Sequence, residues 1–446
     1  MRNVLYIAHY FPPTGGAGVQ RTVKFVKHLP VFGYRPVVLT GQVEEETRWT
    51  PADRSLAEEV STEVVVGRAE WDDGRTRAET RVRRHEAFVG LGGRLIAEHT
   101  TEAIVVTLSP FGDARIAAQL SERYGVPWIA DLRDPWALDE FQEYPTWWHR
   151  RRAREEMGQC LSSAARVVMN TPEAARRFRE AFPSLADRAG TFITNGYDEE
   201  DFSGGVGSSQ GDVFTLVHSG YLHTDTGLRQ RRHRWRNRLL GRLESGVETL
   251  SRSHYYLLPA VARWLEREPA ARNKFRMVFI GVPTAADEKV VAASGMKDLV
   301  TFTGYLPHDE CVRRTRSADV LFLPMHHLPA GRRASIVPGK AYEYMASGRP
   351  IIAAVPEGDA KDFLVAAGTA RVCAPTDVDG LSMALAETFA EWRAGSPVYD
   401  RWRPETVARF ERKILTQQLA GVLDEVVRGA GPAALGAPER RFLAHE

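Results

Sequence analysis

The chain has 446 residues, more than one hydrophobic core usually serves, so its length predicts two domains. Its 43% hydrophobic and 26% charged residues are the balance of an ordinary globular protein, and its net charge of +2 gives no reason to expect nucleic acid as a partner. Three widely spaced cysteines argue against a disulfide framework or a structural zinc site and fit a cytoplasmic protein. No apolar run approaches the ~20 residues that span a bilayer, and the short run at the N-terminus predicts a buried strand instead of a signal peptide.

The first half of the chain alternates short apolar runs with helical segments. Residues 4–8 predict a strand, a loop rich in glycine and proline follows, and residues 19–29 predict a helix, with Val23 and Val26 at helical spacing. Further apolar runs predict strands at 36–40, 64–66, 103–107, 126–130 and 166–169. Parallel strands joined by crossover helices produce this alternation, so residues 1–202 are expected to form one Rossmann-like domain.

A small, polar stretch at residues 203–212 predicts a linker before a second alternation in residues 213–395. The second alternation predicts strands at 214–218, 276–281, 300–302, 320–323 and 350–354. A C-terminal helical segment is assigned to 396–430, with one long helix over 405–427, and a loose tail to 431–446. The predicted fold class is α/β: two facing, doubly wound domains with an interdomain cleft, where ligands bind at the carboxyl ends of the strands.

Residues 335–350 form the stretch most suggestive of chemistry. Pro338 suits the first turn of a helix, because its missing N–H costs nothing there. Gly339 and Lys340 then lie at a helix N-terminus, where free amides and the helix dipole favour an anion. Glu343 lies about 7 Å along the axis, which suits a phosphate at the helix end and a ribose at the carboxylate. On the residues alone, a solvated Glu343 and a surface Lys340 remain an equal alternative.

Residues 342–353 resemble the donor-site segment of the retaining GT-B glycosyltransferases of family GT4. Three further stretches agree in the expected order: the glycine loop at 11–21, an acceptor-domain segment at 130–136 and an interdomain turn at 194–198. The resemblance implies the GT-B fold and a nucleoside diphosphate sugar as co-substrate, with UDP the common base in the family. It also implies transfer with retention, and no metal or other cofactor.

Two of these stretches in the first domain, the glycine loop and the 130–136 segment, contain candidate site residues. Gly15 and Gly16 let the backbone approach a diphosphate at the start of a helix, with a plain strand-to-helix turn as the alternative. Asp131 follows an apolar strand, so we expect it at the cleft edge, orienting an acceptor hydroxyl. Arg133 and Asp134 are expected to form a structural ion pair.

In the second domain, Gly220 follows a strand and matches the glycine that the family places near the phosphates. The family usually has a basic residue shortly afterwards, but an insertion at residues 224–252 intervenes here. Arg252 is therefore the candidate that neutralises the diphosphate together with Lys340. Tyr305 matches the loop that packs on the nucleobase, with a core position as the alternative.

The chain departs from the family at Ser335, where a glutamate usually stands eight residues before the ribose glutamate. Only Glu343 of that pair carries over, which leaves open how the sugar hydroxyls are held; the backbone amides of 337–340 are one candidate. Asp377 and Asp379 superficially match a metal-binding DxD motif. They precede an apolar helix, so we expect a cap there and no metal site.

Residues 227–243, inside the insertion, carry seven arginines. One face of a predicted helix there is apolar, with Trp235, Leu239, Leu240 and Leu243. A basic amphipathic helix is typical of an element that binds a membrane surface or a partner. We therefore predict peripheral binding to anionic lipid, with a second basic and aromatic stretch at 147–152; a disordered, solvated excursion is the alternative.

Together these features predict a metal-independent, retaining glycosyltransferase. Lys340, Arg252 and the helix N-termini stabilise the leaving diphosphate, and the acceptor is a small molecule, a glycan or a lipid-linked molecule. No convincing pair of carboxylates supports a hydrolase. The alternatives are another GT-B enzyme, such as a sugar-nucleotide epimerase or a pseudo-sugar coupling enzyme, and a non-catalytic nucleotide-sugar-binding subunit, which Ser335 keeps open.

Overall fold

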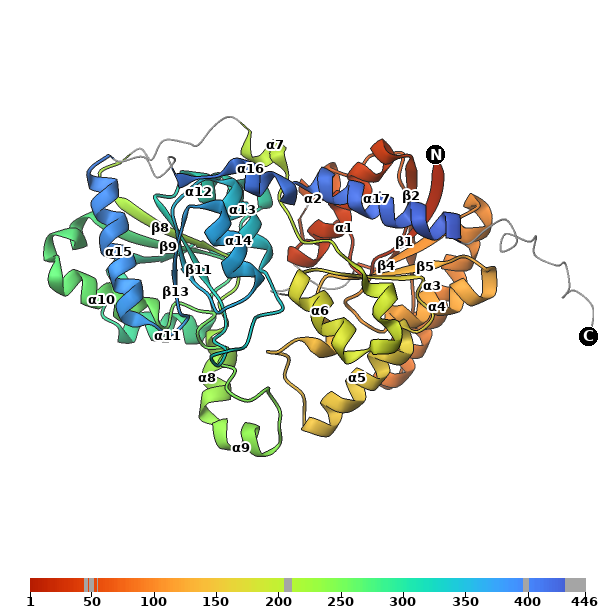
Figure 1. The fold of residues 1–446 in the computed structure, drawn as a ribbon, viewed down its shortest axis with the longest axis horizontal. Coiled ribbons are helices and arrows are strands. Elements are labelled where there is room, and N and C mark those ends of the chain that lie inside the picture. The colour runs from red at the N-terminus through yellow and green to blue at the C-terminus, as the bar shows by residue number, and fades with distance from the viewer. Residues whose placement is uncertain (44–46, 48–51, 54, 204–210, 396–400, 430–446) are drawn as a thin grey trace, which may run out of the picture.

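The computed structural model describes residues 1–446 except 44–46, 48–51, 54, 204–210, 396–400 and 430–446. Two parallel sheets, each covered by helices on both faces, lie side by side in it (Figure 1). The predicted α/β class with two Rossmann-like domains is therefore confirmed. Most of the predicted linker and the whole of the predicted tail lie outside the described residues.

The first sheet has the strand order β3-β2-β1-β4-β5-β6-β7. Its parallel strands are β1 (Arg2–Ile7), β2 (Tyr34–Gly41), β3 (Val65–Ala69), β4 (Ala103–Thr107), β5 (Trp128–Leu132), β6 (Arg166–Met169) and β7 (Thr191–Phe192). The helices between them are α1 (Ala17–His28), α2 (Ser55–Glu58), α3 (Arg77–His99), α4 (Asp113–Tyr124), α5 (Trp147–Leu161), α6 (Pro172–Ala181) and α7 (Glu199–Phe202).

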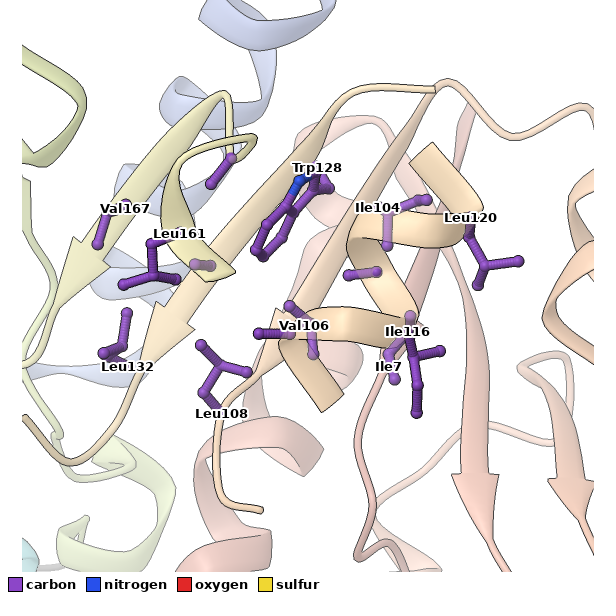
Figure 2. Close-up of a cluster of buried hydrophobic side chains, with 14 of the residues drawn as sticks. Ile7, Ile104, Val106, Leu108, Ile116, Leu120, Trp128, Leu132, Leu161 and Val167 are labelled. Atoms are coloured by element: carbon purple, nitrogen blue, oxygen red, sulfur yellow. The ribbon is translucent and has the colours of Figure 1, made fainter. Parts of the chain in front are cut away.

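The central strands of this sheet are mainly apolar and buried because helices cover both faces. Leu5 and Ile7 pack into the cluster under α3, α4, α5 and α6, part of which Figure 2 shows, whereas Val4 and Tyr6 pack into the cluster under α1. All four side chains are completely buried. Full burial of one such side chain contributes about 1.5–3 kcal/mol. The two clusters therefore hold the strand in place from both faces of the sheet.

The second sheet has the order β10-β9-β8-β11-β12-β13. Its parallel strands are β8 (Phe214–Ser219), β9 (Phe275–Ile280), β10 (Val300–Phe302), β11 (Val320–Pro324), β12 (Ile351–Ala354) and β13 (Ala370–Cys373). Its helices are α8 (Thr224–Arg232), α9 (Arg234–Leu239), α10 (Leu257–Arg267), α11 (Ala285–Ala293), α12 (His308–Ser317), α13 (Gly339–Ala346), α14 (Asp359–Ala367) and α15 (Val378–Arg393).

The strand order reverses beside the first strand of each sheet, between β1 and β4 and between β8 and β11. Parallel α/β sheets bind ligands outside the carboxyl ends of their strands at such reversal points. The loops after β1 and β8 are therefore the places to look for a site. Among the helices described, none is both long and apolar enough to cross a bilayer.

The C-terminal segment crosses from the second domain back onto the first (Figure 1). The single helix predicted over 405–427 is wrong, because Glu411 has an extended backbone (ψ 133°) that separates α16 (Pro404–Val407) and the turn after it from α17 (Arg412–Gly429). The apolar face of α17 joins the cluster beneath α1, with Leu415, Leu419 and Leu423. This segment therefore ties the two domains together.

The basic insertion is also not the single helix that its pattern predicted. His233 separates α8 from α9, and Leu240 and Leu243 lie beyond the end of α9. The alternative of a disordered excursion is wrong as well, because Nδ2 of Asn237 donates to the carbonyl of Gln230 at 3.2 Å and packs the two helices together.

Strands β7 and β13 were not predicted from the sequence. The first has two exposed residues and the second is only half-buried, so neither is a continuous apolar run. Strand β5 starts at Trp128, two residues later than predicted, because Pro127 has no N–H to donate to the sheet.

Candidate functional site

The N-terminus of α13 is uncapped by any side chain. Pro338 is the N-cap residue, one position before the first turn in which it was expected. A Cβ added at Gly339 would meet no atom within 4 Å. The first amides of the helix therefore point to space that a ligand can occupy, and the helix dipole favours an anion there.

The side chain of Lys340 folds back over the end of β8. Its Nζ lies 3.3 Å from Nε2 of His218, whose Nδ1 donates to the carbonyl of Phe322 at 2.9 Å. Burial and the nearby Lys340 charge lower the pKa of His218 well below its ordinary value, so a neutral imidazole accepts from the ammonium group. Gly220 has φ 101°, and a Cβ there would lie 2.5 Å from this Nζ, so only glycine fits.

Arg252 supplies a second cation beside Lys340. Its guanidinium lies 4.7 Å from the ring centre of Phe141, and its Nη1 is buried with no hydrogen-bond partner in the described structure. Burial, followed by the charge of Arg252, lowers the pKa of Lys340 to about 7. Within the described ranges, neither cation forms an ion pair with a carboxylate. Such a pair of cations is suited to an anionic ligand.

Glu343 lies one turn further along α13 and is half-buried. Residues three apart lie on one helix face, so its carboxylate stands beside Lys340. Burial and the charge of Glu343 raise the pKa of the Cys311 thiol to about 12. No protein group in the described structure donates a hydrogen bond to the Glu343 carboxylate, so its oxygens remain available to hydroxyl groups of a ligand.

The glycine loop of the first domain provides a second uncapped helix start. Gly16, with φ 94°, is the N-cap residue of α1 and Gly15 is buried beside it. The guanidinium of Arg133 covers the next turn, because a Cβ at Gly18 would lie 1.7 Å from its Nη1. The loop thus combines a helix start without a side-chain cap, the helix dipole and a cation.

Direct contacts bring this loop up to the second domain. Nε2 of Gln20, in the second turn of α1, lies 3.1 Å from Nδ1 of His308 at the start of α12. The hydroxyl of Tyr305 donates to Asp53 of the first domain at 2.8 Å. Tyr305 is half-buried and bridges the domains, so it is not the core residue of the alternative interpretation.

The structure does not support the acceptor role expected of Asp131. Its side chain is completely buried, and Nη2 of Arg21 donates to it at 2.7 Å while Nε of Arg21 contacts both carboxylate oxygens. Oγ1 of Thr107 donates a further bond at 3.2 Å. Asp131 therefore ties α1 to β5. Arg133 and Asp134 form the expected ion pair, at 3.3 Å.

Ser335 replaces the glutamate that GT4 enzymes usually have, and the carboxylate of Glu140 lies next to it. This completely buried carboxylate accepts from the backbone N of Ser335 at 2.9 Å and also from the Ser335 hydroxyl. His326 Nε2 lies 3.1 Å and Arg177 Nη1 3.0 Å from it. Burial alone would raise the pKa of Glu140, but the bond from His326 and the Arg177 charge lower it to about 2.

The Glu140 contacts join the two domains beside α13. Thr171 Oγ1 donates to the Ser335 carbonyl at 2.7 Å, and the backbone N of Glu173 donates to Asp359 at 2.7 Å. The expected interdomain boundary is therefore crossed by direct bonds, which hold the turn that leads into α13. No local pattern in the sequence marked Glu140.

Asp377 caps α15 as expected, accepting from the backbone N of Gly380 at 2.8 Å. Elsewhere in the described residues, ligand atoms of His28, Asp198 and Glu411 lie within 4.8 Å of one another. The ammonium group of Lys24 pairs with Asp198, so a side chain of the protein already supplies positive charge to these three residues.

Comparison with known proteins finds matches to the second domain and to the whole chain. Residues 240–391 match the family described as glycosyl transferases group 1. The MMP alpha-(1->4)-mannosyltransferase of Mycolicibacterium hassiacum is 27% identical over 316 residues, which cover 68% of this chain and 67% of that protein.

Two solved structures resemble the whole chain. Sucrose-phosphate synthase of Thermosynechococcus elongatus superposes with a TM-score of 0.66 at 14% identity, covering 96% of this chain and 100% of that chain. Anabaena HepE in complex with UDP-glucose superposes with a TM-score of 0.63 at 14% identity, covering 95% and 100%. The chain therefore has the two-domain GT-B fold found in glycosyltransferases, and its second domain matches the group 1 glycosyl transferases.

Proposed function

We propose that this protein transfers a sugar from a UDP-sugar to an acceptor hydroxyl with retention of the anomeric configuration. One observation carries the proposal: Lys340 and Arg252, without a carboxylate partner in the described residues, converge beside the uncapped start of α13. Cleavage of a glycosyl diphosphate leaves negative charge on the departing oxygens. Fixed cations and a helix dipole aimed at those oxygens stabilise the transition state more than the ground state.

The other residues of the site fit the parts of a nucleotide sugar. Glu343 accepts from ribose hydroxyls one turn along α13, and the loop of Gly15 and Gly16 offers amides to the diphosphate from the opposite domain. Tyr305, at the boundary between the two domains, is placed to pack against the nucleobase. Because two cations and two helix ends supply the positive charge, the leaving group needs no metal ion.

Asp139 takes the acceptor role first assigned to Asp131. It is half-buried on the same segment as Glu140, and its carboxylate accepts from the backbone N of Phe141 at 3.0 Å. Burial and the neighbouring Glu140 charge raise its pKa well above the ordinary value. A raised pKa makes the carboxylate of Asp139 a better proton acceptor, which suits hydrogen bonding to an acceptor hydroxyl group.

The donor base and stereochemistry rest on similarity. HepE was solved with UDP-glucose and supports a uridine nucleotide. The resemblance of residues 342–353 to family GT4 supports retention. NMR of the anomeric centre of the newly formed product tests retention directly.

Release of UDP from UDP-glucose and UDP-N-acetylglucosamine, with and without acceptors, tests the proposal. We expect UDP only when an acceptor is present, and strongly reduced release by Glu343→Gln. Glu387→Gln, which changes an exposed carboxylate on α15 of the same domain, is the matched control. Epimerised donor without acceptor would identify an epimerase, and donor binding without turnover on any acceptor would identify a binding subunit.

A further inference from the structure

The proposed transfer leaves one surface of the molecule unexplained. Trp147 and Trp148 begin α5, and α9 carries Trp235 and Leu239; their exposed fractions are 59%, 50%, 72% and 74%. No other tryptophan in the described part of the chain is exposed to this degree. Large apolar side chains gathered on one exposed area commonly mark an interaction site.

The two segments come from different domains and are held together by backbone bonds. The N–H of Trp147 donates to the carbonyl of Leu240 at 2.8 Å, and the N–H of Tyr144 donates to the carbonyl of Arg242 at 2.8 Å. Arg242 also pairs with Glu143 at 3.0 Å. Figure 1 shows α8 and α9 projecting from the lower edge of the molecule, near α5. The exposed rings therefore belong to one surface.

This surface is strongly basic. Four exposed arginines of α8 and α9 have no ion pair within the described ranges: Arg232, Arg234, Arg236 and Arg238. The sequence contains no aspartate or glutamate from residue 226 to residue 243. On the α5 side, the Arg152 guanidinium lies 5.7 Å from the ring centre of Trp148. Arg151 and Arg229 pair with Glu155 and Glu143, but the four arginines named above leave a net positive charge beside the exposed rings.

We propose that this Arg–Trp surface, made of residues 147–152 and 229–239, docks the protein on a membrane that carries anionic lipid headgroups. Tryptophan rings favour the boundary between headgroups and acyl chains, and arginines favour the negative surface potential. Leu239 argues against single-stranded nucleic acid, which is bound by stacking on aromatic rings. A projecting tip also suits a plane better than it suits a strand that needs a groove.

Docking goes beyond sugar transfer and does not depend on it. None of these side chains contacts Lys340 or Glu343, so vesicle binding and turnover are measured independently. Because both domains contribute to the surface, it is complete only in the domain arrangement seen here.

Vesicle sedimentation at low salt tests the charge. We expect binding to vesicles of phosphatidylcholine mixed with phosphatidylglycerol, little binding to phosphatidylcholine alone, and weakening by salt. The triple variant Arg234→Glu, Arg236→Glu, Arg238→Glu should lower the partition coefficient at least ~100-fold, since each arginine near an anionic surface contributes about 1 kcal/mol and 1.4 kcal/mol is tenfold. The control is a second triple variant that makes the same change of charge on other helices, Arg313→Glu, Arg393→Glu, Arg428→Glu. It should bind vesicles as wild type does.

Lipids with brominated acyl chains test the apolar contact. Bromine should quench part of the tryptophan fluorescence of wild type, and less of it in the variant Trp235→Phe. Trp235→Ala with Leu239→Ala should reduce partition, whereas Met383→Ala with Val365→Ala, at comparably exposed positions of the same domain, should not.

Unchanged melting temperatures would confirm that these surface variants fold. The proposal fails if wild type ignores anionic vesicles, if the arginine triple variant binds as wild type does, or if binding occurs without quenching. Binding to single-stranded DNA but not to vesicles would also overturn it and identify a polyanion site instead.

Discussion

Two groups of charged side chains, one in each domain, differ in whether they have a partner of opposite charge. In the first domain, Arg21 and Asp131 saturate each other, and Arg84 lies 3.0 Å from the completely buried Asp113. In the second domain, Lys340 and Arg252 approach each other with no carboxylate ion pair in the described ranges.

We infer that the paired charges stabilise the fold, whereas Lys340 and Arg252 are proposed to bind an anionic ligand. An unpaired buried charge is costly, so a protein retains it where a ligand supplies the partner. A paired one holds elements together, and its loss leaves the partner uncompensated. We therefore expect Asp131 to contribute to stability and Lys340 to ligand binding, although both lie near the carboxyl end of a sheet.

The largest expected effect is on stability, from Asp131→Asn. Loss of this carboxylate leaves Arg21 buried without its counter-ion, which should lower the free energy of unfolding by about 3–5 kcal/mol. Thermal melting measures it. Asp134→Asn removes a half-exposed carboxylate three residues away and should cost about 1 kcal/mol or less. Equal melting temperatures for the two variants would contradict a special stabilising role of the buried Asp131 ion pair.

The next effect is on binding, from Lys340→Ala. Removing a cation that has no carboxylate partner should leave the melting temperature unchanged or higher. The Kd for UDP should rise between about 10-fold and 100-fold, as expected for one charge-assisted hydrogen bond of about 1.5–3 kcal/mol. Calorimetric titration measures the Kd, with Lys361→Ala on α14 as control. A variant that melts much lower but binds UDP normally would assign Lys340 to the fold.

The pH dependence of binding sharpens the assignment. A pKa of about 7 in the free protein means that Lys340 loses its charge as pH rises through 7, whereas a bound diphosphate raises that pKa. UDP should therefore bind most tightly below pH 7 and weaken by up to about tenfold per pH unit above it. His218 is already neutral and Cys311 still protonated in this range. Lys340→Arg should remove the dependence; its persistence would exclude Lys340 as the titrating group.

The smallest effect belongs to Asp377→Ala. Loss of the cap should lower the free energy of unfolding by about 0.5–2 kcal/mol and leave UDP release unchanged. A loss of turnover without a loss of stability would show that the carboxylate acts in the reaction.

Local patterns predicted the donor helix and most strands. Pro338 before Gly339, and the one-turn spacing from Lys340 to Glu343, depend only on neighbouring residues, and the structure bears out both helix and spacing. The continuous apolar strands follow from burial on both faces. The half-buried β13 gave no such signal.

Contacts between distant segments were beyond local patterns. Glu140 meets Ser335 across a separation of 195 residues, and only the arrangement of the domains brings them together. Asp131 lies at the end of an apolar strand, as residues of a binding site often do. Its ion pair with Arg21 of α1 makes it a structural residue instead. The bonds from Tyr144 and Trp147 to Arg242 and Leu240 likewise join segments that are far apart in the sequence.

Calorimetric titration with UDP and UMP on wild type and on the double variant Lys340→Ala, Arg252→Met tests the central claim most directly. If the two cations hold a diphosphate, wild type binds UDP at least about tenfold more tightly than UMP, and the variant loses that difference while uridine-dependent binding persists. If wild type does not bind UDP, or the variant keeps the full preference for UDP over UMP, the assignment of the donor site to Lys340 and Arg252 is contradicted.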